Sequence, residues 1–209
     1  MPIRGLAVLL FALAALLLSA LSAQAAHADD AAYRYEFTPF IAYRSGGKIT
    51  DADSDESFDL DESSAQGLIL NIGANPKGQY ELLYARQDTA IETLAGLDVE
   101  YLQFGGTYLF EGTVARPFIA LTLGATRFDP APSGFDSESF FSASFGGGLQ
   151  LNAAKRIGLR LEARVYATFL SDNSKIFCAS DSGGAGCAIE ASGSSFTQWE
   201  ARAGLVFRF

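Results

Sequence analysis

Residues 33–44 read YRYEFTPFIAYR, and this stretch decides the fold class. Most of its large apolar residues share one parity, as Tyr35, Phe37 and Ile41 do, whereas Glu36 and Arg44 share the other. Period-two alternation places the two sets on opposite faces of a β-strand. A strand with an aromatic face and a charged face predicts a sheet whose two sides meet different environments.

The same alternation recurs in further segments of about ten residues, separated by turn sequences. The eight segments cover about 33–44, 65–75, 79–88, 98–110, 117–128, 141–151, 158–169 and 198–209. Short connections follow the second, fourth and sixth segments, and longer ones follow the first, third, fifth and seventh. This pattern predicts an all-β, antiparallel, up-and-down barrel that spans a membrane, with both termini at the end of the short turns. A soluble barrel such as a lipocalin is the alternative, but it would turn its apolar face inward.

The composition excludes several classes of function. The chain has 209 residues, 49% of them hydrophobic, a formal net charge of -9 and one histidine, His27. The acidic balance argues against nucleic-acid binding, because phosphate affinity comes from Lys and Arg. Because His27 falls in a leader-like segment, no histidine remains for a folded active site, and we expect no catalytic residues and no enzymatic activity.

Residues 1–28 predict a cleaved secretory signal peptide, which leaves 29–209 as the barrel domain. Arg4 supplies the positive start, an apolar run follows, and two A-x-A sites allow cleavage before Ala26 or before Asp29. An uncleaved membrane anchor is the alternative. Beyond this segment, no apolar run reaches the roughly 20 residues that a membrane-spanning helix needs.

Four stretches carry a resemblance to a known family: LQFGGTYLF (102–110), RPFIA (116–120), GLRLEAR (158–164) and GLVFRF (204–209). With the alternation over about 33–209, the chain resembles the eight-stranded bacterial outer-membrane β-barrels of the OmpA, OmpX and OmpW type, a porin-like group. Its ending, with Gly204, Phe207 and Phe209, is similar to the C-terminal signal that the barrel-assembly machinery reads. The resemblance implies a monomer in the outer membrane of a Gram-negative bacterium, in contact with membrane lipid and lipopolysaccharide.

The face opposite the aromatics predicts a network of charges inside the barrel. Its candidate members are Arg34, Glu36, Glu81, Glu100, Arg160, Glu162, Arg164, Glu200 and Arg202. An eight-stranded barrel is only wide enough for side chains to fill, so we expect these residues to form a salt-bridged plug. The barrel would then have a structural or surface-interaction role through its extracellular loops. The alternative is a narrow channel for small solutes or hydrophobic compounds.

Two loop features add weaker predictions. The acids Asp51, Asp53, Asp55, Asp59 and Glu62 copy the spacing of a calcium-binding loop, although Glu56 replaces the glycine that such a loop needs. We therefore expect no cofactor other than possible calcium. Cys178 and Cys187 bracket a glycine-rich tip, which in an exported chain predicts a disulfide-closed hairpin.

Overall fold

The computed structural model describes residues 34–50, 57–91, 95–130, 137–152, 154–170, 174–181, 184–191 and 195–209. The predicted signal peptide, residues 1–28, lies outside the described residues, as do Asp51, Asp53 and Asp55. Within these ranges no helix has the length and apolar character needed to cross a membrane.

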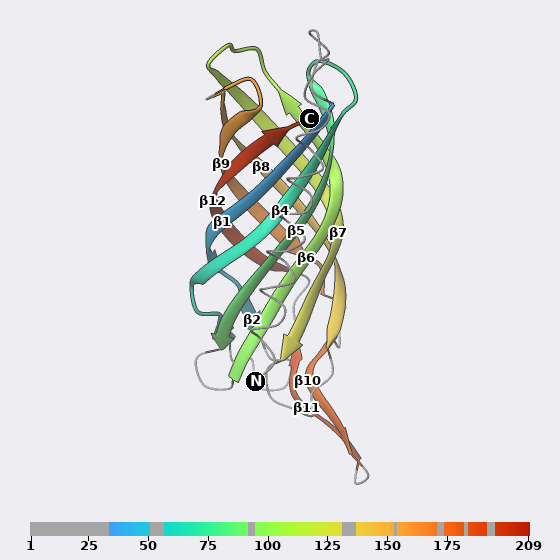
Figure 1. The fold of residues 1–209 in the computed structure, drawn as a ribbon. Helices are drawn as coiled ribbons and strands as arrows, with labels where there is room; N and C mark the ends of the chain where they lie inside the picture. The colour runs from blue at the N-terminus through green and yellow to red at the C-terminus, as the bar shows by residue number, and fades with distance from the viewer. Residues whose placement is uncertain are drawn as a thin grey trace, which may run out of the picture. The chain divides into compact units, whose positions relative to one another are not determined.

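Eight strands pair into one closed antiparallel barrel, which confirms the predicted fold class (Figure 1). Around the barrel the order is β1 (Tyr35–Gly46), β12 (Phe196–Arg208), β9 (Ile157–Thr168), β8 (Glu138–Asn152), β7 (Ala115–Pro130), β6 (Ala95–Leu109), β5 (Gly78–Ile91) and β4 (Ser63–Gly73), which pairs with β1 again. Closure leaves no free sheet edge, as a spanning sheet requires.

The barrel closes where its first and last strands meet. In the pairing of β1 with β12, Phe37 lies opposite Phe207 and Tyr43 opposite Ala201. The Phe209 carbonyl accepts hydrogen bonds from the backbone N–H groups of Arg34 (3.1 Å) and Tyr35 (3.2 Å). The two ends of the barrel domain therefore lie together, at the end of the short turns that include 74–77, 110–114 and 154–156, which we call the terminus end.

The opposite end differs from the prediction in two ways. The long loop expected after the third segment is only 92–94, because β5 and β6 keep pairing as far as Ile91 and Ala95. Two small hairpins also occupy the long connections: β2 (Lys48–Thr50) with β3 (Ser57–Asp59), which was not predicted, and β10 (Ser174–Asp181) with β11 (Gly184–Ala191), where the sequence predicts a hairpin. The β10–β11 hairpin projects away from the end that holds the C-terminus (Figure 1).

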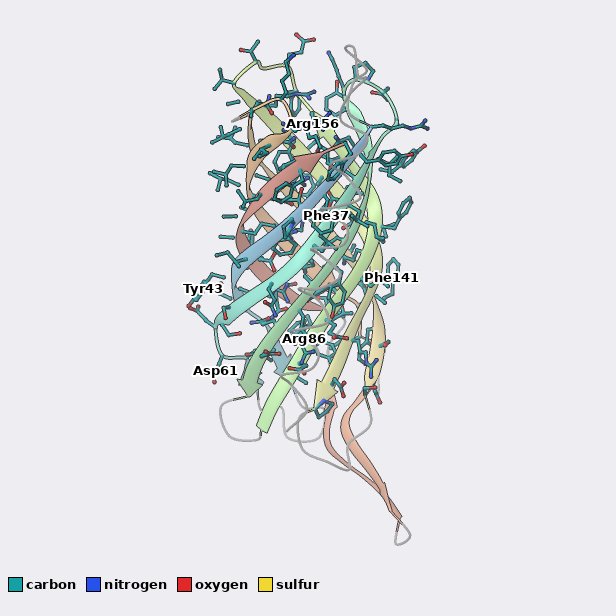
Figure 2. The ribbon with its side chains drawn as sticks, viewed as in Figure 1. Phe37, Tyr43, Asp61, Arg86, Phe141 and Arg156 are labelled. Atoms are coloured by element: carbon teal, nitrogen blue, oxygen red, sulfur yellow. The ribbon has the colours of Figure 1, made fainter. Side chains whose placement is uncertain are left out.

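The side chains are distributed as in a membrane barrel, with the apolar face outward. Ile41 is 72% exposed and Trp199 is 63% exposed, whereas Arg44 and Arg160 are fully buried inside. Figure 2 shows this outer layer along the barrel, with Phe37, Tyr43 and Phe141 labelled in it. The predicted outward apolar and inward polar faces are therefore confirmed.

Candidate functional site

The described barrel interior gathers five arginines and four glutamates, all more than nine-tenths buried. They are Glu36, Arg44, Glu81, Arg160, Glu162, Arg164, Glu200, Arg202 and Arg208. Each lies at an inward position of its strand, because steps of two along a strand keep one face. The interior is therefore a candidate site built from several strands at once.

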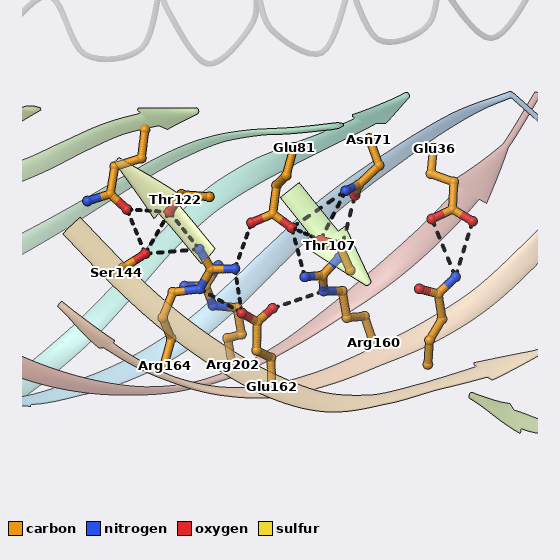
Figure 3. Close-up of polar contacts among 12 residues, drawn as sticks. Glu36, Asn71, Glu81, Thr107, Thr122, Ser144, Arg160, Glu162, Arg164 and Arg202 are labelled. Carbon is orange, nitrogen blue, oxygen red and sulfur yellow. Dashed lines mark hydrogen bonds and ion pairs between the residues drawn. The ribbon is translucent and has the colours of Figure 1, made fainter. Parts of the chain in front are cut away.

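The middle of the interior is a ring of two arginines and two glutamates (Figure 3). The Arg164 Nη2 atom lies 2.6 Å from both Glu81 Oε1 and Glu162 Oε1. Arg160 completes the ring, with Nη2 3.0 Å from Glu81 Oε2 and Nε 2.9 Å from Glu162 Oε2. Each carboxylate thus lies between two guanidinium groups, which compensates the cost of burying its charge.

Hydroxyl and amide groups satisfy the remaining positions around this ring. The Thr107 hydroxyl donates to Glu81 Oε2 (2.5 Å). Arg164 Nη1 donates to the hydroxyl oxygens of Thr122 (3.2 Å) and Ser144 (3.1 Å), which lie 2.7 Å apart. Figure 3 shows these donors and acceptors meeting from facing walls of the barrel. The network therefore links strands that are far apart around the sheet.

Inward glycines make room for these long side chains and for the close approach of strands. A Cβ at Gly146 would lie 2.5 Å from Glu162 Oε1. At Gly148 it would lie 1.9 Å from the Leu161 carbonyl oxygen. Gly146 and Gly148 of β8 are therefore explained by packing, and nothing in them indicates a phosphate-binding loop.

A second cluster lies nearer the end of the barrel opposite the termini, which carries the hairpins and which we call the hairpin end. Arg44 donates through Nε to Glu200 Oε2 (2.9 Å), and its Nη2 donates to the same oxygen. Its guanidinium lies 4.8 Å from the ring centre of Tyr101 and 5.1 Å from that of Tyr166. Arg202 pairs with Glu200 at 2.7 Å. Rings and charges therefore pack together here, although Arg202 Nε and Nη1 are buried without a hydrogen-bond partner.

A third cluster fills the terminus end of the interior. Arg208 Nε lies 2.9 Å from Glu36 Oε1, and Gln150 Nε2 donates to the same carboxylate at 3.1 Å. Arg208 Nη2 also donates to Asn152 Oδ1 (2.7 Å). The last strand is thereby tied through its side chains to β1 and β8.

An apolar layer covers the charged clusters at the hairpin end. Its buried members include Leu97, Val99, Phe128 and Phe196, with the Phe128 and Phe196 rings 5.3 Å apart in an edge-on contact. Leu60 from the first long connection joins this layer, and its backbone N–H donates to the Gly47 carbonyl (2.9 Å). Part of a loop that the sequence presents as acidic therefore helps to close the barrel.

Two of the predicted interior residues lie elsewhere, and both placements are corrected here. Arg34 precedes β1 and is exposed at the terminus end. Glu100 faces outward on β6, where it accepts a hydrogen bond from the Tyr84 hydroxyl (3.0 Å). The other seven candidates lie inside. Arg44 and Arg208 were missed, although the parity of their strands points to the interior.

Glu100 belongs to a belt of charged residues on the outer surface, beyond the apolar band. In the register, Arg86, Glu100 and Arg127 lie side by side on β5, β6 and β7. The next row holds Asp88, Asp98 and Asp129. Arg86 pairs with Asp98 (2.5 Å) and Asp88 (3.2 Å). These strands therefore extend past the lipid-facing band into a polar environment.

The predicted calcium ligands are only partly described. Asp59 lies in β3, and Glu62 accepts a hydrogen bond from the Tyr43 hydroxyl (2.6 Å). No group of three or more potential metal ligands occurs among the described residues. For the predicted disulfide, the register of β10 and β11 sets Cys178 opposite Cys187. Both remain predictions.

No protein-family model matches the chain, and no curated protein matches it. Among solved structures, Neisserial surface protein A is similar over 84% of this chain and 97% of its own, with a TM-score of 0.61 and 11% identity. Ail, the attachment invasion locus protein of Yersinia pestis, solved with the heparin analogue sucrose octasulfate, covers 83% of this chain and 99% of its own, with a TM-score of 0.45 and 15% identity. Escherichia coli outer membrane protein W covers 87% and 100%, with a TM-score of 0.42 and 14% identity. At such identities the likeness to Neisserial surface protein A establishes the fold alone.

The chemistry of the interior is that of compensated charge. Every buried glutamate of the described barrel pairs with at least one arginine: Glu36 with one, and Glu81, Glu162 and Glu200 with two each. Removing one partner of such a pair would leave an uncompensated buried charge. By its strand pairing and its likeness to Neisserial surface protein A, the chain is an all-β, eight-stranded barrel with the fold of the bacterial outer-membrane β-barrel family.

Proposed function

We propose that the protein resides in the outer membrane of a Gram-negative bacterium and acts at the cell surface as a closed, non-conducting barrel. The hairpin end would face outward, and the terminus end would face the periplasm. In this arrangement the extracellular loops and hairpins carry the function. The barrel positions them and is surrounded by lipopolysaccharide and phospholipid.

The observation that carries this proposal is the filled interior. Three charged clusters follow one another along the barrel, and their arginines Arg44, Arg160, Arg164 and Arg208 are each held by glutamate. An apolar layer with Phe128 and Phe196 covers the hairpin end. An ion would have to displace both kinds of barrier, one by breaking buried ion pairs and the other by wetting an apolar constriction.

The charges at the two ends support this orientation. The described turns of the terminus end and the start of β7 carry Lys77, Arg116, Lys155 and Arg156 against one acid, Glu111, whereas the outer belt at the other end holds four acids and two arginines. Figure 2 shows Arg156 at the terminus end, with Asp61 and Arg86 near the other. Assembly through the ending with Gly204, Phe207 and Phe209 and a monomeric state belong to the same proposal.

Conductance tests the closed state. Pure refolded protein in a planar lipid bilayer should give no resolvable openings. The variant with Phe128→Ala and Arg164→Met together serves as a positive comparison, since it removes part of each barrier. Reproducible openings of the wild-type protein would replace the closed barrel with the narrow channel.

Labelling of whole cells tests the orientation. Asp61→Cys places a thiol at the hairpin end, and Glu111→Cys places one in a turn at the other end, where the Glu111 side chain is 83% exposed. A membrane-impermeant maleimide should label the first on intact cells and the second only after the outer membrane is permeabilised. The wild-type protein controls for its own two cysteines. The reverse pattern, or labelling of neither thiol, contradicts the proposal.

A further inference from the structure

The lipid-facing wall has a gap at Gly106. In the register across β5, β6, β7 and β8, outward positions are occupied in turn by Tyr80, Gly106, Leu121 and Phe145. An open groove of about 630 Å³ lies over this glycine. The groove is therefore large enough to hold a chain-like ligand.

The barrel itself does not require a glycine at this position. At the neighbouring Gly105 a Cβ would lie 2.0 Å from the Leu121 carbonyl oxygen, so that glycine is fixed by packing. At Gly106 the one atom within 4 Å is the Gln79 carbonyl oxygen at 3.2 Å, a tight contact that a shift of a few tenths of an ångström would relieve, and φ is not positive. Glycine weakens a strand, and where packing does not explain it, it often marks the close approach of a ligand.

The walls of the groove suit a hydrocarbon chain. Phe104 and Tyr108 border Gly106 along β6, and the Tyr80 and Phe104 rings lie 6.3 Å apart. Leu121 and Phe145 line the far side, and both are more than half exposed at the outer surface. Lipid tails are as apolar as the groove, so no hydrophobic driving force favours binding there. A hydrocarbon chain in the groove is instead held by close van der Waals packing.

The groove ends at the basic turns of the terminus end. Its lining includes Ala74, Asn75 and Gly78, which flank Lys77. Lys77 Nζ lies 2.8 Å from Glu111 Oε1, but these side chains are 46% and 83% exposed. Such an exposed ion pair contributes little energy, so a phosphate can replace the carboxylate at low cost. The charge at this end complements an anionic headgroup.

We propose that the groove binds one acyl chain of an inner-leaflet phospholipid, with the phosphate held at the Lys77 turn. This site rests on the proposed orientation, in which the terminus end lies in the periplasmic leaflet. The glycine gap, the aromatic walls and the basic turn then form one elongated lipid site on the outside of the barrel.

Native mass spectrometry of the refolded barrel tests the site, with phosphatidylglycerol as the probe and diacylglycerol as a phosphate-free comparison. The wild-type protein should retain one phosphatidylglycerol more strongly than diacylglycerol. Gly106→Phe fills the groove and should weaken retention by about fivefold or more, which corresponds to about 1 kcal/mol. Lys77→Gln should weaken phosphatidylglycerol retention and leave diacylglycerol unchanged.

Matched controls separate the site from general effects. Ala125→Phe adds the same ring at an outward position of β7 outside the groove, and Lys155→Gln removes a charge from another turn of the same end. Both should retain the lipid as the wild-type protein does. If Gly106→Phe fails the heat-modifiable gel shift of a folded barrel, Gly106→Val provides a smaller filling of the groove.

The lipid site would be overturned if the Gly106 variants retained phosphatidylglycerol as strongly as the wild-type protein, or if the control variants lost it as much as the Gly106 variants. A wild-type dimer that the Gly106 variants abolish would also overturn it, because the groove would then bind a second copy of the chain. Because the assay uses purified protein, its outcome is independent of the whole-cell labelling. Reversed labelling with intact lipid retention would refute the proposed orientation and the leaflet, but not the groove.

Discussion

Replacement of Arg164 by methionine is the sharpest test of the interior network. The change removes a fully buried guanidinium that lies 2.6 Å from carboxylate oxygens of both Glu81 and Glu162. It also removes the donor to Thr122 and Ser144. Two buried carboxylates are then left with Arg160 as their shared partner. Breaking a buried ion pair from one side costs about 3–5 kcal/mol, so the free energy of unfolding should fall by that amount.

Urea unfolding of the barrel in lipid vesicles measures this change. Arg127→Met is the matched control, because Arg127 is half exposed and its pair with Asp129, at 3.4 Å, should contribute less than about 1 kcal/mol. Arg164→Met combined with Glu81→Gln should lose less than the two single variants together, by about 1–3 kcal/mol. If Arg164→Met loses no more stability than Arg127→Met, the network does not hold the interior as described here.

Three further predictions concern the apolar layer at the hairpin end, the outer belt and the inward glycines. Phe128→Ala in the apolar layer should lower the free energy of unfolding by about 3–5 kcal/mol, measured in the same assay. Conductance should stay absent because the charged clusters remain. Openings in this variant would show that the apolar layer alone is the barrier to ions. Burial and the facing Asp88 raise the pKa of Asp98 from 3.8 to about 6, so its contribution to stability is complete below about pH 4 and is lost as the pH rises through 6. Carboxyl ¹³C titration should show this midpoint, and Asp98→Asn should remove the loss of stability between pH 5 and 7; a midpoint near 4 contradicts it. Gly148→Ala should abolish the folded band in a gel-shift assay, because its Cβ would lie 1.9 Å from the Leu161 carbonyl oxygen, whereas Gly106→Ala should fold.

Much of the fold was predictable because lipid enforces a strict alternation. A residue such as Ile41 or Leu121 faces outward, and the residues beside it face the interior. Every strand that crosses the apolar band therefore shows period-two alternation in its sequence. The rule ends where the band ends. The continuation of β5 and β6 to Ile91 and Ala95 and the β2–β3 hairpin lie outside the eight alternating segments, so the alternation did not indicate them. The β10–β11 hairpin was indicated by a different signal, the two cysteines that bracket its glycine-rich tip.

The two misplaced charges fail for the same physical reason. Glu100 shares its parity with the outward Leu102, so the alternation places it outside, although its charge suggests the interior. Beyond the band an outward carboxylate meets water and costs nothing. Arg34 lies at the other limit, before β1 begins. A charge therefore indicates the interior only within the span of the apolar residues on its own strand.

The specific partners inside the barrel were beyond the sequence for another reason. Arg164 and Glu81 lie on β9 and β5, which are not neighbours in the sheet, so their contact depends on the shear and the diameter of the closed barrel. The parity of Arg44 gives its face, but only closure brings it to Glu200 and the two tyrosine rings.

The charge-paired interior also limits where selection for a specific function can act. Inward positions must keep charge compensated, and outward positions within the band must stay apolar, so substitutions at either cost stability directly. The hairpin end escapes both constraints. There Asp88, Asp98 and Asp129 are held in register on three adjacent strands rather than on loops. A partner at this end would meet charges at fixed spacings, so its recognition should respond to single substitutions in these strands more than to changes in loop length.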